Sequence, residues 1–167
     1  MEMRLRPWEA EDALSICAYA NNSKIAENLR DAFPFPYGLE DARGFVQSCI
    51  RAEGEGQICR AICVGEQAVG SIGVFVGKDV YRRSAELGYW LAEPFWGRGI
   101  MSCAVEQICK QAFERFDICR IYAEPYAQNI GSRRVLEKAG FCLEGVLRKS
   151  VIKNGQMHDS CIYALVK

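Results

Sequence analysis

The sequence predicts an α+β fold in which a mixed, mostly antiparallel sheet of about seven strands carries helices on both faces. Apolar residues alternate along residues 58–64, 68–76 and 84–91, and only short polar segments separate these runs, which indicates neighbouring antiparallel strands. A long amphipathic stretch at 99–116 then leads to a further strand at 120–123. A strand, a helix and a strand in this order favour a parallel, right-handed crossover.

The elements that precede this sheet are a short strand and several helices. Residues 4–6 form the opening strand, and the acidic residues at 9, 11 and 12 suit the first turn of the helix that follows, since negative charge is favourable at a helix N-terminus. A short helical piece is predicted at 24–29, and prolines exclude regular structure from 33–37. Apolar residues then return at helical spacing, namely Leu39, Ala42, Phe45, Val46, Cys49 and Ile50.

The last third of the chain predicts one more helix and a hairpin. Residues 130–139 form the helix, and Gly140 ends it at the position where glycine is favoured. The last two strands flank Asn154 and Gly155, a pair typical of a two-residue hairpin turn.

Composition narrows the class of protein. Residues 1–167 suffice for one domain with its own core, and the 21 basic residues balance the 21 acidic ones. This balance gives no overall basic field, so no nucleic acid and no membrane surface is expected as a direct partner. No apolar run is long enough to span a membrane and the first residues do not resemble a signal peptide, so a cytoplasmic location is expected.

Nine cysteines are many for this length, but no two have the C-x-x-C spacing. Their odd number does not suit a framework of intramolecular disulfides, and His158 is the only histidine, so no metal site is expected. Most cysteines lie within apolar periodic segments. We therefore expect reduced, buried cysteines that act as small apolar residues.

The most informative segment is the glycine-rich stretch at 94–102, between the strand at 84–91 and the long helix. Gly97 and Gly99 leave backbone N–H groups uncovered there, and the helix N-terminus adds partial positive charge. This arrangement predicts a phosphate-binding loop. The alternative is a turn that caps the helix without a ligand.

Three segments at their observed spacing resemble the GNAT N-acetyltransferase superfamily, and its ribosomal-protein serine/alanine N-acetyltransferase branch in particular. They read AELGYWL at 85–91, WGRGI at 96–100 and NIGSRRVLEKAGF at 129–141. Residues 33–42 and 144–159 are also similar to that branch. The resemblance covers essentially the whole chain and implies a V-shaped split between two central parallel strands, with acetyl-CoA as the acyl donor.

The resemblance also implies which residues hold coenzyme A. The strand backbone at Tyr89, Trp90 and Leu91 pairs with the pantetheine arm, and Asn129 either holds the pantetheine, caps its helix, or does both. Arg133 or Arg134 reaches the phosphates of the cofactor. The loop that holds the pyrophosphate comprises Trp96, Gly97, Arg98, Gly99, Ile100, Met101 and Ser102. Trp96 and Met101 depart from the family pattern, which has Gln or Arg at the first position and Gly or Ala at the second.

The implied reaction is direct transfer of an acetyl group from a thioester to an amine, and it needs a base and a donor to the leaving thiolate. Ser132 matches the position that faces the cofactor sulfur, whereas Leu136 replaces the tyrosine that many members use. The base is Glu124, Glu86, or a water chain without a dedicated carboxylate. Val151 replaces a glutamate of the nearest branch, so the base of that branch does not carry over.

The acceptor side is less well defined by the sequence. Phe33, Phe35 and Tyr37 either line the acceptor or pack in the core. The acceptor is a primary amine, either the N-terminal α-amine of a protein or a small amine such as a polyamine, amino acid or antibiotic. A non-catalytic acyl-CoA sensor is a further alternative, whereas the missing G-x-G-x-x-G and G-K-[ST] motifs disfavour a flavin or nucleotide binder. Either a monomer or a homodimer is compatible with this interpretation.

Overall fold

A seven-stranded sheet with the order β1-β2-β3-β4-β5-β7-β6 organises the computed structural model, which describes residues 2–167. All neighbouring strands are antiparallel except β4 and β5, so the mixed and mostly antiparallel sheet is confirmed. The strands are β1 Met3–Arg6, β2 Gln57–Val64, β3 Gln67–Val76, β4 Ser84–Leu91, β5 Arg120–Ala123, β6 Cys142–Lys153 and β7 Gln156–Val166. The helices are α1 Asp12–Ala20, α2 Ser23–Ala26, α3 Leu39–Arg51, α4 Ile100–Arg115 and α5 Ile130–Lys138, with 3-10 turns at Asp79–Tyr81 and Glu93–Phe95.

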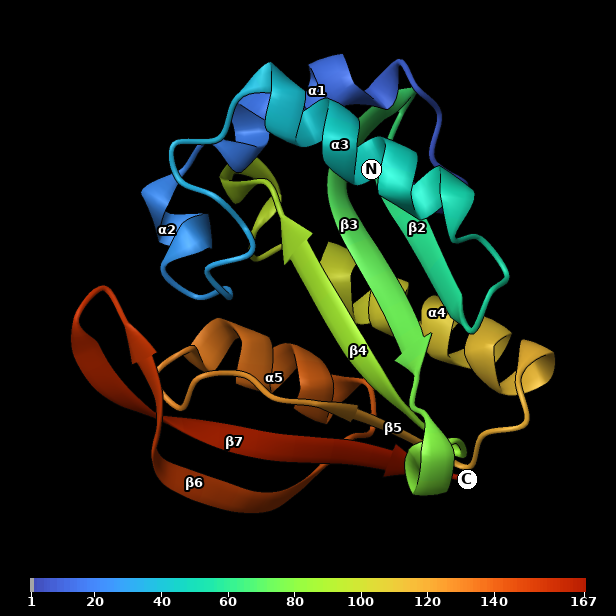
Figure 1. Cartoon of the computed structure of the whole chain (residues 1–167), viewed down its shortest axis with the longest axis vertical. Coiled ribbons are helices and arrows are strands. Elements are labelled where there is room, and N and C mark those ends of the chain that lie inside the picture. The colour runs from blue at the N-terminus through green and yellow to red at the C-terminus, as the bar shows by residue number, and fades with distance from the viewer. Residues whose placement is uncertain (1) are drawn as a thin grey trace.

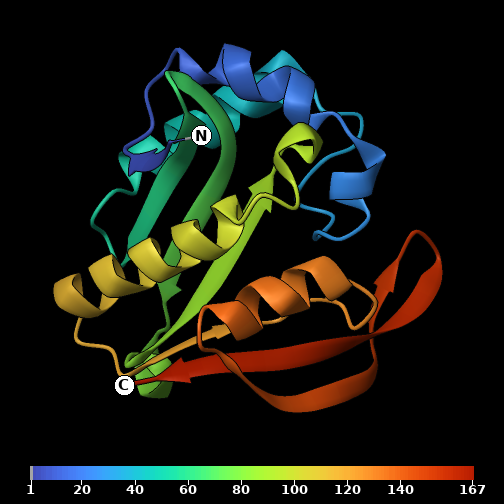
Figure 2. The same ribbon diagram turned by 180° about the vertical axis from the view of Figure 1, so that it is seen from behind.

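Helices cover both faces of the sheet, as the sequence predicts. Helices α1 and α3 lie on the face seen in Figure 1, and α4 and α5 lie on the opposite face in Figure 2. The alternation of β2 shows how the two cores form, because successive side chains of a strand point to opposite faces. Ile58 and Ile62 belong to the core under α4, whereas Cys59, Ala61 and Cys63 belong to the core under α1 and α3.

A split opens between the two central parallel strands. Strands β4 and β5 pair only from Ser84 opposite Arg120 to Glu86 opposite Tyr122. Beyond these residues the strands diverge (Figures 1 and 2), so the last part of β4 has no partner strand on that edge. The V-shaped split is therefore confirmed.

The local signals of the last third are also confirmed. Lys153 pairs with Gln156 across a turn in which Asn154 and Gly155 both have positive φ, 50° and 76°. Helix α5 ends where Gly140 takes a φ of 90°, and the next N–H, that of Phe141, donates to the Leu136 carbonyl.

Two local predictions need correction. The helical piece predicted at 24–29 is α2, which starts at Ser23 because the Asn22 side chain caps it, and which gives way to turns after Ala26. The expectation that the cysteines are buried is wrong for Cys103 and Cys142, which are exposed, whereas five others are buried. All nine cysteines are free thiols.

Residues 2–167 contain neither a candidate metal site nor a candidate membrane span. No three His, Cys, Asp or Glu side chains are gathered in a way that would hold a metal ion. No helix in the same residues is long and apolar enough to cross a membrane.

We predict that Gly70→Ala destabilises the protein. Gly70 lies on β3 opposite Leu91, and a Cβ there would come within 2.5 Å of the Trp90 carbonyl oxygen, which is backbone and cannot swing aside. The expected loss is about 1–3 kcal/mol in the free energy of unfolding, measured by urea denaturation. Gly44→Ala is the control, because that exposed helical glycine has nothing within 4 Å, and it should be neutral or stabilising by up to about 1 kcal/mol. Equal stability of the two variants would contradict the close approach of β3 and β4.

Candidate active site

The glycine-rich loop leads directly into α4 and leaves its backbone accessible. Gly97 and Gly99 have φ values of 72° and 75°, and a Cβ at either position would meet nothing within 4 Å. Gly99 caps α4 without a side-chain hydrogen bond, so the N–H groups of the first helical turn are free to bind an anion. The backbone geometry of the loop therefore suits phosphate binding.

The two departures from the family motif leave this loop open. The Trp96 indole N–H donates to the Leu91 carbonyl at 2.7 Å, which ties the loop to the end of β4. The Met101 side chain is buried in the core under α4. Neither side chain therefore replaces the backbone N–H groups as the lining of the loop.

A cleft of about 660 Å³ lies between the two arms of the split. The loop, the end of β4, one side of α5 and the segment around α2 form its walls. Its basic lining residues are Lys24, Arg134 and Lys138, and Glu27 is its acidic one. The predicted residues that line it are Tyr89, Trp90, Leu91, Trp96, Gly97, Gly99, Ile100, Met101, Ser102, Asn129, Ser132 and Arg134.

Asn129 and Ser132 stand together at the start of α5. The Asn129 side chain accepts a hydrogen bond from the Ser132 N–H at 3.3 Å, so Asn129 caps the helix, and it also lines the cleft. Its contact with pantetheine stays a prediction. The cap orients the first turn of α5 and thereby the Ser132 side chain.

Ser132 has a partner that the sequence analysis missed. Its Oγ lies 2.6 Å from the hydroxyl oxygen of Tyr89, so a side chain of β4 meets a side chain of α5 across the cleft. Loss of water around the phenol raises the pKa of Tyr89 to about 12, so the phenol is neutral at physiological pH. Strand alternation was the sequence signal that could have indicated this contact, because it places the Tyr89 side chain on the same face as Leu87 and Leu91.

The two candidate arginines point in different directions. The Arg133 guanidinium donates to the Tyr163 hydroxyl at 3.1 Å and to the Ala127 carbonyl at 3.0 Å, which holds it against β7. Arg134 lines the cleft. Of the two alternatives, the structure therefore favours Arg134 as the residue that can reach a cofactor phosphate.

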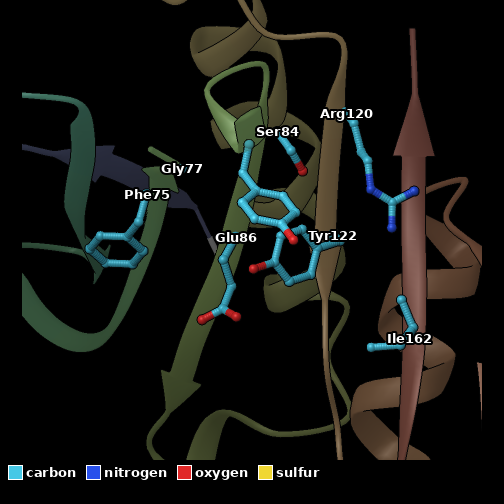
Figure 3. Close-up of a pocket in the computed structure, with 8 residues that line it drawn as sticks. Phe75, Gly77, Ser84, Glu86, Arg120, Tyr122 and Ile162 are labelled. Atoms are coloured by element: carbon cyan, nitrogen blue, oxygen red, sulfur yellow. The ribbon is translucent and has the colours of Figure 1, made fainter. Parts of the chain in front are cut away.

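A second pocket, of about 260 Å³, lies on the opposite face of the sheet from Ser132, where β4 and β5 still pair. Figure 3 shows the Glu86 and Tyr122 side chains projecting from neighbouring strands into the same space, with Phe75 on one side and Ile162 on the other. Arg30, from the segment after α2, donates to both carboxylate oxygens of Glu86 at 2.9 and 3.1 Å. Glu86 is therefore held in an ion pair.

Glu124 directly follows β5, and its carboxylate is close enough to Glu86 and Arg30 to be affected by both charges. Loss of water around its carboxylate and the negative charge of Glu86 raise the pKa of Glu124, and Arg30 partly opposes this effect. Within residues 2–167 the Glu124 carboxylate makes no hydrogen bond or ion pair. A carboxylate without a partner and with a raised pKa is suited to accept a proton.

The aromatic segment at 33–37 divides between core and surface. Phe33 packs between Tyr37 and Trp90, with ring centroids 5.0 and 5.8 Å away, and Tyr37 is only 6% exposed. Of the two alternatives for Tyr37, core packing fits the structure, because the ring belongs to the core under α1 and α3. Phe35 is 54% exposed and is the member of this group that is open to an acceptor.

Comparisons with known proteins agree with this geometry. A family model described as an acetyltransferase (GNAT) domain matches residues 2–142. N-acetyltransferase p20 of Bacillus licheniformis, itself uncharacterized, is 30% identical over 168 residues, which cover 99% of this chain and 93% of that protein. The ribosomal-protein-serine acetyltransferase of Escherichia coli K12 is 27% identical over 132 residues, covering 79% of this chain and 74% of that protein.

The structural comparison extends over nearly the whole chain. RimL, a ribosomal L7/L12 alpha-N-protein acetyltransferase solved in complex with coenzyme A, aligns with a TM-score of 0.87 and 25% identity, covering 98% of this chain and 93% of that one. Three further relatives from Bacillus subtilis, all named N-acetyltransferases, match over 49%, 56% and 57% of their own length. The chain thus spans about half the length of these three relatives.

We predict opposite effects of two charge-removing substitutions on the pKa of Glu124. Glu86→Gln should lower this pKa, because it removes the neighbouring negative charge, and Arg30→Gln should raise it, because it removes the positive one. Carboxyl titration by NMR measures both shifts, with Glu40→Gln on α3 as a control outside the cluster. Shifts of the same sign would show that Glu86, Arg30 and Glu124 do not form one electrostatic group.

Proposed function

Because the chain belongs to the GNAT family of N-acetyltransferases, we propose that it transfers the acetyl group of acetyl-CoA to the N-terminal α-amine of a protein, of the ribosomal-protein type. The observation that carries this proposal is the split between β4 and β5, with the glycine-rich loop at one end and Ser132 in its wall. The named ribosomal-protein acetyltransferases among the relatives support the class of acceptor.

The residues of the cleft fit coenzyme A. The open N–H groups around Gly97 and Gly99 suit a pyrophosphate, and Arg134 and Lys138 add positive charge. The unpaired edge of β4 between Tyr89 and Leu91 offers backbone groups for an extended pantetheine arm, as a strand edge does for a peptide, although the Leu91 carbonyl already accepts from Trp96. Bound acetyl-CoA supplies the acetyl group as an activated thioester.

The two chemical tasks fall on opposite faces of the sheet. Ser132, on the face of α4 and α5, donates a hydrogen bond where negative charge develops on sulfur. Glu124, on the other face, accepts the proton of the attacking amine. Glu86 is the weaker candidate for the base, because Arg30 already occupies its carboxylate. The split connects the two faces, so donor and acceptor can approach from opposite sides.

The open face around Glu86 and Glu124 suits a chain terminus. None of the α-helices in residues 2–167 covers β5, β7 and β6 on that face (Figure 1), which leaves room for a peptide beside the 3-10 turn at Asp79–Tyr81. The exposed Phe35 is available for an apolar contact with such a peptide. Ribosomal proteins as acceptors would place the enzyme in the cytoplasm.

The acceptor is tested with a panel of amines. Release of free thiol from acetyl-CoA is measured with peptides that start with Ser or Ala, with the same peptides after N-terminal acetylation, and with polyamines, amino acids and aminoglycosides. We expect turnover only with free peptide N-termini. Turnover with small amines alone would show that the acceptor is a small molecule. Binding of acetyl-CoA without turnover of any amine would indicate a sensor.

The base is tested with Glu124→Gln and Glu86→Gln over a range of pH. We expect Glu124→Gln to lower kcat/KM by about 10²-fold or more and to remove the part of the low-pH fall in rate that comes from the carboxylate, because a general base acts only when deprotonated, whereas the part that comes from protonation of the acceptor amine should remain. Glu86→Gln should keep the part that comes from the carboxylate but move it to lower pH, because removal of the Glu86 charge lowers the pKa of Glu124. The reverse pattern would assign the base to Glu86.

A further inference from the structure

We propose that Tyr89 positions the hydroxyl group of Ser132, so that Ser132 keeps its own hydrogen for the sulfur of the coenzyme. This inference rests on the proposed function and deepens it. The family resemblance assigns a role only to the backbone of Tyr89 and none to its side chain.

The contact between the two hydroxyl groups is short and comes from two different walls. Tyr89 projects from β4 and Ser132 from the first turn of α5, and their oxygens lie 2.6 Å apart. The Tyr89 hydroxyl lies much farther, 3.4 Å, from the Ser132 carbonyl oxygen, so the side-chain contact is the dominant one. Both residues line the cleft of about 660 Å³.

The chemistry of the two groups gives the hydrogen bond a direction. Each hydroxyl has one hydrogen to donate, and the serine oxygen can accept as well. A phenol is the more acidic of the two and is the better donor. When Tyr89 donates to Ser132 Oγ, the Ser132 hydrogen is free to point into the cleft.

No other hydroxyl group on this face of α5 can donate a hydrogen bond to Ser132 in this way. Leu136, one turn after Ser132, is fully buried and apolar. The phenol that supports Ser132 therefore comes from the neighbouring strand instead of from the helix.

The step is balanced without proton transfer from either hydroxyl. A C–N bond to the amine forms, the C–S bond breaks, and the sulfur keeps the electron pair. Ser132 donates a hydrogen bond to that sulfur, and Tyr89 polarises Ser132 while retaining its own proton, in keeping with its pKa of about 12. The proton of the amine passes to Glu124.

The test measures the thiol pKa of bound coenzyme A, which requires no acceptor. The ultraviolet absorbance of the thiolate reports this pKa in the complex, with the acetyl-CoA complex as the spectral blank. A donor to the thiolate lowers the pKa, so Ser132→Ala should raise it by about one unit, and Tyr89→Phe should raise it by a smaller amount. The double variant should equal Ser132→Ala, because Tyr89 acts only through Ser132.

The choice of variants separates the effect of the two hydroxyl groups on the thiol pKa from the effects of other charges and of misfolding. The other charged groups that line the cleft, Lys24 and Glu27 beside β4 and Arg134 and Lys138 on α5, are the same in every variant. Tyr19→Phe is the matched control, because it removes a phenol hydroxyl bonded to Gln67 away from the cleft, and it should leave the thiol pKa unchanged. Calorimetric affinity for acetyl-CoA should stay within about twofold in all variants if the cleft is intact.

Kinetics with the best acceptor provides a second measurement. Tyr89→Phe should lower kcat by about tenfold at unchanged KM for acetyl-CoA, a smaller effect than that of Ser132→Ala. A wild-type thiol pKa in Tyr89→Phe, or additive effects in the double variant, would overturn the role of Tyr89 while leaving the proposed function in place. Failure of the wild-type protein to bind coenzyme A would overturn both.

Discussion

The end of hydrogen bonding between β4 and β5 is the constraint on which the site depends. The two strands pair over three residues and then separate. A sheet that stayed closed would leave no free edge on β4 and no passage between its faces. The glycine-rich loop and the start of α5 each follow one of the diverging strands, so the same event that opens the sheet also places both elements at the rim of the opening.

Strand alternation distributes the chemistry around this opening. Glu86 and Tyr89 are three residues apart on one strand and therefore face opposite sides. The register of β4 and β5 places Tyr122 beside Glu86, and Glu124, just after the end of β5, is affected by the Glu86 charge. The carboxylates thus gather on the uncovered face, where Arg30 limits their mutual repulsion, and the hydroxyl pair forms on the face that α4 and α5 cover. A shift of one residue in the register of β5 would turn Tyr122 to the opposite face of the sheet, away from Glu86.

The sequence predicted the features that depend on local backbone conformation and on the spacing of apolar residues. Alternation predicted the strands, Gly140 and Asn154-Gly155 predicted their turns, and the spacing of Gly97 and Gly99 predicted the loop, because each signal acts within a few residues. Side-chain directions were predicted less well. Adjacent residues on α5 differ by about 100° in direction, so Arg133 turns to Tyr163 and Arg134 to the cleft, and no motif distinguishes them. The burial of Tyr37 and the contact between Tyr89 and Ser132 depend on elements more than 40 residues apart.

The segment after α2 shows how the two arms of the split are held relative to each other. The Leu29 carbonyl accepts from Tyr126, Arg30 pairs with Glu86, and Asp31 pairs with Lys153, so three consecutive residues of the segment contact β4, the loop after β5, and β6. Arg30 and Asp31 are largely exposed, and exposed ion pairs contribute little to stability individually, but the Lys153 side chain that pairs with Asp31 is only 8% exposed. The two apolar cores stabilise the arms themselves, whereas these polar contacts set the position of the segment over Glu86. Glu86 therefore lies under a segment that is attached to both arms of the split.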